Sequence, residues 1–362
     1  MQKVKNILIC PLEWGLGHAG RMIPVASELI AAGNNVLIGS GTELAELFRN
    51  EVDGLKYISF PGFRIRYSGW LPQYLKIILS APSFAYHIIK EHRLLKKIIK
   101  EYSVDIVISD SRPGLWNKNI KTVFVSHMMR VPCPKALRFA DAAGIALIRK
   151  LISRFDYCFI PDLPGELNLS GNLSHGVKYQ QNVRFIGILS RFSLENQEPV
   201  NLTAKYYCTV ILSGPEPQRS MLRNKLAGIL ERSGKPSVIL EGKPGGRSYS
   251  VTRGNLLFID HLPAAEMKKI ILGSQHIITR SGYTTLMELV SLQKSALIIP
   301  TPGQSEQEYL ACLMVERGWF VSASQDSLED DLVLPGNHTG LSDGITVESR
   351  RLLRDALNEL LE

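Results

Sequence analysis

Short, continuous apolar runs recur along the whole of this chain, and helical patterns separate them. The runs are 4–10, 35–38, 105–109, 122–126, 156–160 and 183–186 in the first half, then 207–212, 237–240, 256–259, 276–279 and 295–299. A strand that is apolar on both faces has to be covered on both faces, as in a parallel sheet flanked by helices. The pattern therefore predicts an α/β protein with Rossmann-like, doubly wound parallel sheets.

The length of the chain and one polar stretch predict two domains. A chain of 362 residues exceeds what one ordinary hydrophobic core supports. Residues 194–203, LENQEPVNLT, are polar, include a proline and separate two βα series, which is typical of a linker. We therefore predict domains over 1–193 and 204–346 that face a central cleft, with an amphipathic helix over 347–362.

Positive charge is concentrated in the first half of the chain. The net charge is +8; residues 1–195 contain 25 Lys and Arg against 15 Asp and Glu, whereas residues 196–362 contain 17 against 19. The first half is expected to face an anionic partner, either a phosphorylated acceptor or an anionic membrane surface. No nucleic-acid-binding motif accompanies the charge, so a nucleic-acid partner is not expected.

Cysteine usage and the N-terminus favour a cytoplasmic location. The five cysteines are scattered, odd in number and without a C-x-x-C pair, which argues against a disulfide framework and against a zinc site. The chain opens directly with an apolar run and lacks the pattern of a signal peptide.

Residues 60–102 interleave basic side chains with aliphatic and aromatic ones. No stretch reaches the roughly 18 charge-free apolar residues that membrane spanning requires, and Pro72 and Pro82 interrupt the pattern. A basic, aromatic-rich helical pair over 64–100 can lie among anionic lipid headgroups, as a peripheral contact on the inner face of the cytoplasmic membrane. The same pattern equally fits two amphipathic helices packed on the sheet, and both interpretations stay open.

The loop after the first apolar run carries a candidate base. The loop, PLEWGLGHAG at 11–20, contains G-x-G-x-x-G, but it is longer than the dinucleotide-binding turn and no acid ends the second strand, so a dinucleotide site is rejected. His18 lies between glycines just before a helix expected over 21–32. A neutral imidazole there can accept a hydroxyl proton, with helix capping as the alternative role.

Two other strand ends carry groups that move protons. The run 105–109 leads into Asp110, and the run 122–126 leads into His127. Both ends fall on the ligand-binding edge of a parallel sheet. Asp110 and His127 are therefore alternative acid or base candidates, and structural roles for them stay open.

The densest set of nucleotide-binding groups falls within 276–309. A strand meets a helix at Arg280, Ser281 and Gly282, where free N–H groups and the helix dipole attract phosphate. Thr285 and Glu288 share one face of that helix, and a carboxylate there can accept both hydrogens of a ribose diol. Amides and carboxylates suited to a polyhydroxylated group follow in a loop: Gln304, Glu306, Gln307 and Glu308. A second turn suited to phosphate, Ser213-Gly214, precedes another helix.

Taken singly, each of these residues also fits a helix cap or a solvated helix face. Their combination at successive strand ends favours a ligand site. The stretch from Arg280 onwards resembles the donor-nucleotide site of glycosyltransferase family 28, in which R-S-G followed by Thr and Glu at this spacing binds the ribose and phosphates of UDP-N-acetylglucosamine. The resemblance further implies Arg191 on the donor diphosphate, Ile259 against uracil, and Gln307-Glu308, where the family has a Gln pair, on the donor sugar.

The acceptor side resembles the same family less closely. Residues 14–18, WGLGH, match in position a glycine-rich loop whose His is a candidate base. The family's His-Glu-Gln-Asn segment, which contacts the acceptor, corresponds to 127–130, HMMR. The acceptor contacts implied by the resemblance are Glu13, Trp14, Gly15, Gly17 and Arg130. Because several of them differ from the family pattern, we expect a different acceptor.

The resemblance implies the GT-B fold, with the terminal helix crossing back to the N-terminal domain. It implies an inverting, metal-independent glycosyltransferase that moves N-acetylglucosamine or another hexose from a UDP-sugar to a hydroxyl of a lipid-linked or cell-envelope glycan. No D-x-D pair is available for a divalent ion, and no cofactor beyond the UDP-sugar is expected. Two alternatives stay open: a UDP-sugar 2-epimerase of the same fold, and a non-catalytic nucleotide-sugar-binding protein.

Overall fold

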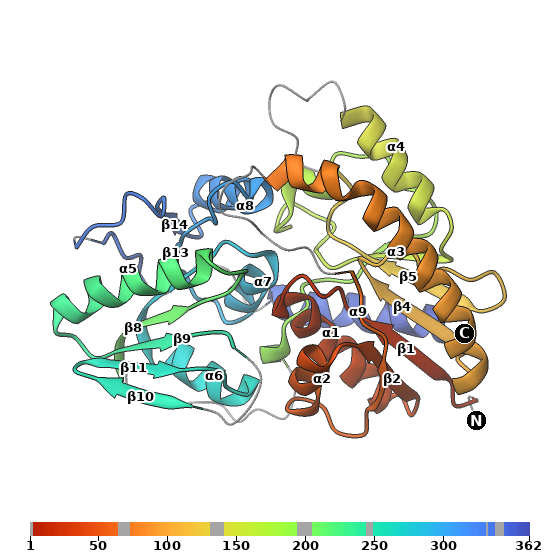
Figure 1. Ribbon diagram of the computed structural model, residues 1–362, viewed down its shortest axis with the longest axis horizontal. Coiled ribbons are helices and arrows are strands. Elements are labelled where there is room, and N and C mark those ends of the chain that lie inside the picture. The colour runs from red at the N-terminus through yellow and green to blue at the C-terminus, as the bar shows by residue number, and fades with distance from the viewer. Residues whose placement is uncertain are drawn as a thin grey trace.

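A computed structural model of the chain describes residues 3–63, 73–130, 141–193, 205–243, 249–330, 332–336 and 344–362, with backbone only over 73–81. Two seven-stranded sheets, each with helices packed on it, lie next to each other (Figure 1). The predicted α/β fold with two doubly wound sheets is thereby confirmed. The predicted linker, 194–203, lies outside the described residues, as do 64–72 of the predicted membrane-contact segment.

The first sheet is entirely parallel, with the strand order β3-β2-β1-β4-β5-β6-β7. Its strands are β1 Asn6–Cys10, β2 Asn35–Ser40, β3 Lys56–Ser59, β4 Ile106–Asp110, β5 Lys121–Val125, β6 Tyr157–Ile160 and β7 Val183–Phe185. The chain builds outward from β1 through β2 and β3, and then returns to β4 on the other side of β1. The segments after β1 and β4 therefore flank the switch point of the sheet, where such sheets bind ligands.

The second sheet has the order β10-β11-β9-β8-β12-β13-β14, and its switch point lies between β8 and β12. Its strands are β8 Tyr206–Ile211, β9 Ser237–Leu240, β10 Ser250–Arg253, β11 Leu256–Ile259, β12 Ser274–Thr279, β13 Leu297–Ile298 and β14 Val321–Ser322. The edge strand β10 departs from the parallel sheet that we predicted, because it pairs antiparallel with β11. Gly254, with φ 57°, allows the tight turn that joins these two strands.

Nine α-helices pack on the sheets within the described residues: α1 Leu16–Ala31, α2 Thr42–Arg49, α3 Gln73–Tyr102, α4 Asp141–Ile152, α5 Gln218–Ser233, α6 Ala264–Leu272, α7 Tyr283–Ser291, α8 Ser305–Glu316 and α9 Gly344–Leu361. Three of them differ from the predictions. α1 begins at Leu16 and not at residue 21, α3 is one helix despite Pro82, and α8 begins at Ser305, inside the expected loop. Helix propensity suggested breaks at glycine and proline, but the packing of these helices on the sheets overrides it.

The last helix, α9, lies beside the elements of the N-terminal sheet (Figure 1). Arg184 of β7 forms an ion pair of 2.7 Å with Glu359, and Lys121 of β5 donates a hydrogen bond of 2.9 Å to the carbonyl of Leu360. Gly187, with φ 73°, lets the chain pass so close to Ser349 that a Cβ atom would collide with it. These contacts hold α9 against the N-terminal sheet.

None of the helices described is both long enough and apolar enough to traverse a lipid bilayer.

Candidate functional site

A cleft with an empty volume of about 600 Å³ lies where the carboxyl ends of the two sheets meet. The N-terminal domain and the segment that follows it contribute Leu16, Gly17, Gly20 and Arg191 to its lining. The C-terminal domain contributes Ile211, Leu212, Ser213, Leu240, Gly242, Asp260, His261, Leu262, Met267, Thr284, Thr285 and Glu288. Of the predicted site residues, Gly17, Arg191, Ser213, Thr285 and Glu288 therefore share one cleft.

An arginine and two carboxylates lie at one side of the cleft. Arg191 Nε donates a hydrogen bond of 2.8 Å to Glu288 Oε1, and Arg191 Nη1 lies 3.8 Å from Glu51 Oε1. All three residues are largely buried. Burial raises the pKa of Glu288, against the effect of Arg191. Burial also raises the pKa of Glu51 to about 7, again opposed by Arg191. A cation held between two partly desolvated carboxylates is suited to exchange one of them for a phosphate.

The turn after β8 supplies Ser213 to the cleft, and Gly214 follows with φ 94°, a value that favours glycine. The helix α5 begins only at Gln218, so this turn is not directly at a helix N-terminus as we predicted. Ile259 is buried in β11, and its carbonyl accepts a hydrogen bond of 2.8 Å from the Glu241 N–H. The cleft is lined by the three residues after it, 260–262.

The turn at 280–282 does not line the cleft, contrary to the predicted phosphate seat. Arg280 is fully buried and donates to the carbonyls of Gln218, Ile299 and Pro300 and to Gln325 Oε1, and burial lowers its pKa to about 10. Ser281 Oγ donates to the Gln307 carbonyl. Gly282 is the N-cap residue of α7, and no side chain makes a capping hydrogen bond there. Nη1 and Nη2 of Arg280 are engaged because the backbone around the end of β13 offers carbonyls that need donors, whereas Nε has no partner among the described residues.

The predicted sugar-binding residues lie at the start of α8. Gln304 is the residue before the helix, and Gln307 is buried with its Oε1 accepting a hydrogen bond of 2.9 Å from the Thr301 N–H. Glu308 is exposed and accepts a hydrogen bond of 3.0 Å from the Gly303 N–H. These contacts hold the turn before α8, and none of the three residues lines the cleft.

On the N-terminal side, His18 and Asp110 form a pair. His18 lies in the first turn of α1 instead of the loop that we expected, and its Nδ1 is 2.9 Å from Asp110 Oδ2 at the end of β4. Arg21, one turn further along α1, contacts both oxygens of Asp110. Arg21 and Asp110 are fully buried, whereas the His18 side chain is 22% exposed. Ser111, directly after Asp110, has φ 56°, a strained conformation of the kind found at functional sites.

The electrostatics of the pair favour a neutral His18 beside an ionised Asp110. Burial would raise the pKa of Asp110, but Arg21 and His18 outweigh burial and hold the pKa at about 2. Burial lowers the pKa of His18; Asp110 opposes that shift, and Arg21 adds to it. His18 Nδ1 lies 2.9 Å from Asp110 Oδ2 and 3.0 Å from Arg21 Nη2. Arg21 Nη2 has Asp110 Oδ1 and Ser111 Oγ as other acceptors, whereas the Asp110 carboxylate cannot donate, so the carboxylate favours the tautomer with hydrogen on Nδ1. Nε2 then keeps its lone pair, and no hydrogen bond from a described residue engages it.

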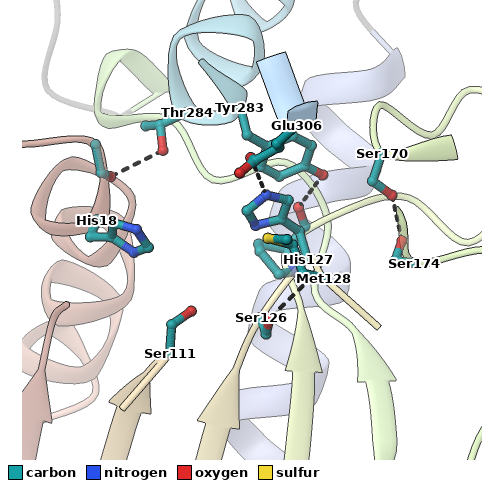
Figure 2. A network of polar contacts seen from close by, with 12 residues as sticks. His18, Ser111, Ser126, His127, Met128, Ser170, Ser174, Tyr283, Thr284 and Glu306 are labelled. Carbon is teal, nitrogen blue, oxygen red and sulfur yellow. Dashed lines mark hydrogen bonds and ion pairs between the residues drawn. The ribbon is translucent and has the colours of Figure 1, made fainter. Parts of the chain in front are cut away.

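His127 occupies a different position in the network, shown in Figure 2. Its Nδ1 is 3.1 Å from Arg21 Nη1, and its Nε2 is 2.8 Å from Glu306 Oε1. Its ring is stacked on that of Tyr283, with centroids 4.0 Å apart and planes 2° from parallel. Because both ring nitrogens are engaged, His127 has no free lone pair for a substrate proton, in contrast to its predicted role as a base. Asp110, with its low pKa, fits the role of partner to His18 and not that of base.

The predicted acceptor contacts surround the start of α1. Glu13 Oε1 accepts from the Gly41 N–H, and Trp14 Nε1 donates a hydrogen bond of 2.8 Å to the Phe63 carbonyl. Gly15 is the residue before α1, and a Cβ on Gly17 would lie 3.0 Å from Thr284 Oγ1, so a small residue is needed there. Arg130 lies on a separate segment, where its N–H donates to the Leu173 carbonyl.

The sequence analysis missed Arg21 and the contact between Glu306 and His127. A signal for Arg21 was present, because residues three apart on a helix share a face and Arg21 follows His18 by three. The prediction that the helix begins at residue 21 concealed this relation. The contact of Glu306 with His127 has no local signal, since 179 residues separate the two.

Comparison with known proteins confirms the family resemblance. Residues 255–334 match the family described as Glycosyltransferase family 28 C-terminal domain. A protein of Methanosarcina mazei described as an uncharacterized glycosyltransferase is 23% identical over 339 residues, which are 87% of this chain and 84% of that protein.

Solved structures share the fold of the whole chain. Acinetobacter baumannii MurG is 14% identical with a TM-score of 0.52, over 99% of both chains. The glycosyltransferase SsfS6 of Streptomyces sp. SF2575, whose structure was solved in complex with thymidine diphosphate, is 14% identical with a TM-score of 0.55, over 98% of this chain and 96% of that one. The GT-B fold expected from the resemblance is confirmed.

Proposed function

We propose that this chain, a glycosyltransferase of the GT-B fold, transfers a hexose such as N-acetylglucosamine from a UDP-sugar to an acceptor hydroxyl with inversion. One observation carries the proposal: His18, paired with the buried Asp110, directly follows Gly17, which lines the cleft. His18 Nε2 takes the hydroxyl proton as the acceptor oxygen forms its bond to the anomeric carbon. The bond from that carbon to the diphosphate oxygen breaks, and UDP leaves with the electron pair. Asp110 stabilises the imidazolium that results.

The donor is assigned to the C-terminal side of the cleft. Glu288 accepts from the ribose hydroxyls, with Thr285 one turn before it, and Arg191 exchanges a carboxylate contact for the diphosphate. The backbone at Ser213-Gly214 approaches the phosphates closely, because glycine leaves room there. Binding of thymidine diphosphate to a protein of the same fold supports a pyrimidine nucleotide as the donor carrier. Arginine and backbone dipoles supply the charge stabilisation, so the proposed reaction needs no metal ion.

The acceptor is assigned to the N-terminal side, as a lipid-linked or cell-envelope glycan reached from the cytoplasmic face of the membrane. One exposed face of α3 supports this assignment, because its apolar and basic side chains are suited to a peripheral contact with anionic lipid: Tyr86, Ile89, Lys90, Arg93, Leu94 and Lys97. The inner face of α3, with the buried Leu95 and Ile98, packs on the sheet. We expect salt-sensitive co-sedimentation with anionic liposomes; absence of binding at low salt would contradict the membrane contact.

The test of the proposal begins with a panel of nucleotide-sugars. We expect a UDP-sugar to raise the melting temperature most, and the reaction of that donor with hydroxyl acceptors to give a product of inverted anomeric configuration by NMR. Retention of configuration would contradict the mechanism. Incubation with the donor alone separates transfer from 2-epimerisation. The contacts of Glu13 with Gly41 and of Asp110 with Arg21 disfavour epimerisation, since they occupy carboxylates that such an enzyme needs.

A further inference from the structure

The C-terminal domain reaches the His18 pair through one carboxylate. Glu306, in the first turn of α8, lies 2.8 Å from His127 Nε2 (Figure 2). The His127 side chain is 7% exposed and that of Glu306 is 23% exposed, so this is a contact in a largely desolvated position. Tyr283 of α7 covers the imidazole ring and donates its hydroxyl to the Pro161 carbonyl at 2.8 Å.

The directions of the hydrogen bonds in this chain of residues are fixed by what each group can donate. Arg21 can only donate, so His127 Nδ1 accepts its hydrogen at 3.1 Å. Neutral His127 then carries its hydrogen on Nε2 and donates it to Glu306. Arg21 also donates to both oxygens of Asp110, and its Nη2 lies 3.0 Å from His18 Nδ1. The ionised carboxylate of Asp110 cannot donate, so it accepts from His18 at 2.9 Å. The hydrogen bonds therefore run without a break from α8 of one domain to α1 of the other.

We infer that Glu306 is a positioning residue for the transfer reaction, holding His18 in its working orientation through His127, Arg21 and Asp110. The inference rests on the proposed function, because it assumes that His18 is the base. It adds that a residue of the donor-binding domain keeps His18 in position. Each link has two contacts that restrict its rotation: Arg21 binds both Asp110 and His127, and His127 is hydrogen-bonded and stacked. Such surrounding contacts keep a reactive group and its direct partner in a fixed orientation.

A second contact between the domains lies on the other side of His18. Thr284 of α7 donates a hydrogen bond of 3.1 Å to the Gly17 carbonyl. Thr284 and Tyr283 are neighbours in α7, so one turn of the C-terminal domain touches both the residue before His18 and the ring of His127. α7 thus contacts the residue before His18, and α8 contacts His127, in addition to the direct contact of His18 with Asp110. The donor-binding domain thereby completes the site of proton transfer.

Charge also connects Glu306 to the base. Burial would raise the pKa of Glu306, but His127, His18 and Arg21 outweigh burial and lower it. By reciprocity, an ionised Glu306 favours the protonated form of His18. The other charged or titratable groups that act on His18 are Asp110 on β4, Arg21 on its own helix and His127 after β5.

Three variants test the inference in a UDP-release assay with the donor that the panel selects. We expect Glu306→Ala to lower kcat by about 10- to 100-fold while the donor KM changes by less than about twofold, because it loosens the orientation of the base. Glu306→Gln retains an oxygen that accepts from His127, so kcat should stay within about threefold of that of the unmodified protein. Glu316→Ala, at the exposed end of the same helix, is the matched control and should change neither constant. A normal kcat in Glu306→Ala would overturn the inference.

The pKa of His18 gives a readout that needs no substrate. Histidine labelled with carbon-13 at Cε1 is followed by NMR during a pH titration, and the His18 signal is assigned by its loss in His18→Ala. Both Glu306 variants should lower the pKa of His18, and Glu316→Ala should leave it unchanged. An unchanged pKa of His18 in both Glu306 variants would contradict the connection, even if Glu306→Ala folded poorly.

A double-mutant cycle tests whether Glu306 acts through His127. The variant carrying both His127→Ala and Glu306→Ala should be no slower than His127→Ala alone, whereas multiplied effects would overturn the relay. His18→Ala separates this inference from the proposed function. If His18→Ala is as fast as the unmodified protein, both are wrong. If it is inactive while Glu306→Ala is fully active, only the role of Glu306 is wrong.

Discussion

The two domains both place the carboxyl ends of a largely parallel sheet at one cleft, yet the side chains at these ends differ. In the N-terminal domain the start of α1 and the strand ends carry buried polar and charged groups that contact each other: His18, Arg21 and Asp110, extended by His127. In the C-terminal domain the cleft wall combines apolar side chains with polar ones, among them Ser213, Thr285 and Glu288. One side is suited to moving a proton, and the other to holding a nucleotide.

This difference shows that the fold alone does not assign chemistry to a domain. Both switch points offer strand ends and helix starts, and the first brings an imidazole to a buried carboxylate. At the second switch point, Arg280 follows β12 and donates four hydrogen bonds to other groups of the protein. The division of labour predicts that substitutions in the two halves affect different kinetic constants.

The largest effect is expected on the N-terminal side. Replacing His18 by Ala removes the only candidate base with a free nitrogen among the described residues. We expect kcat to fall by about 10²- to 10⁴-fold, as for loss of a general base, with the Kd for UDP unchanged. Steady-state kinetics and calorimetry measure the two constants. A weakened Kd with normal kcat would reverse the assignment of the two domains.

The next effect is expected on the C-terminal side. Glu288→Ala removes a buried acceptor, which corresponds to about 1.5–3 kcal/mol for a hydrogen bond to a charged group. The Kd for UDP should therefore rise by about 10- to 150-fold, measured by calorimetry. Glu231→Ala, on the exposed end of α5, is the control. An unchanged affinity in Glu288→Ala would show that the nucleotide does not bind as proposed.

Much of this arrangement could be predicted from the sequence. Strands that are apolar on both faces predicted both sheets, and the rule that ligands lie at strand ends placed Asp110 and His127 near the site. The pairing of His18 with Asp110 was not predicted, because it depends on which strands are neighbours. β4 lies beside β1, with Ile106 paired to Ile7, although 99 positions separate these two residues in the sequence. Strand order is a property of the tertiary fold and leaves no local pattern.

The predicted site residues that do not line the cleft share a physical feature. A sequence shows which groups can bind a phosphate, but not which of them the protein already uses. Arg280 and Gln307 both satisfy buried backbone groups, a demand created by the packing of β13 and α8. Arg191 differs, because its partners are the carboxylates of Glu288 and Glu51 and not backbone carbonyls.

The pH dependence sharpens the comparison, because His18 should titrate in kcat, whereas Glu51, with a pKa of about 7 beside Arg191, should titrate in the Kd for UDP. Burial, with the help of Arg21, lowers the pKa of His18 below 6.5, so the base stays neutral at pH 7. As pH falls through that pKa, His18 becomes protonated and kcat should drop by about tenfold per unit. Asp110, with a pKa of about 2, stays ionised throughout. A midpoint above pH 7 in the kcat profile would contradict a base in this environment.

The smallest effect is expected from metal removal. In the proposed mechanism the departing diphosphate is neutralised by Arg191 and by the backbone at Ser213-Gly214, which a chelator leaves intact. We expect EDTA to change kcat by less than about twofold, a much smaller change than the loss of one charge-assisted hydrogen bond causes. The control is Arg191→Met, which should weaken the Kd for UDP whether or not Mg²⁺ is added. If EDTA abolished activity and Mg²⁺ restored it, a cation would have to share the diphosphate with Arg191. Binding of the diphosphate would then require a metal ion in addition to the protein groups. The donor side of the cleft would then differ from the proton-transfer side in needing a metal ion.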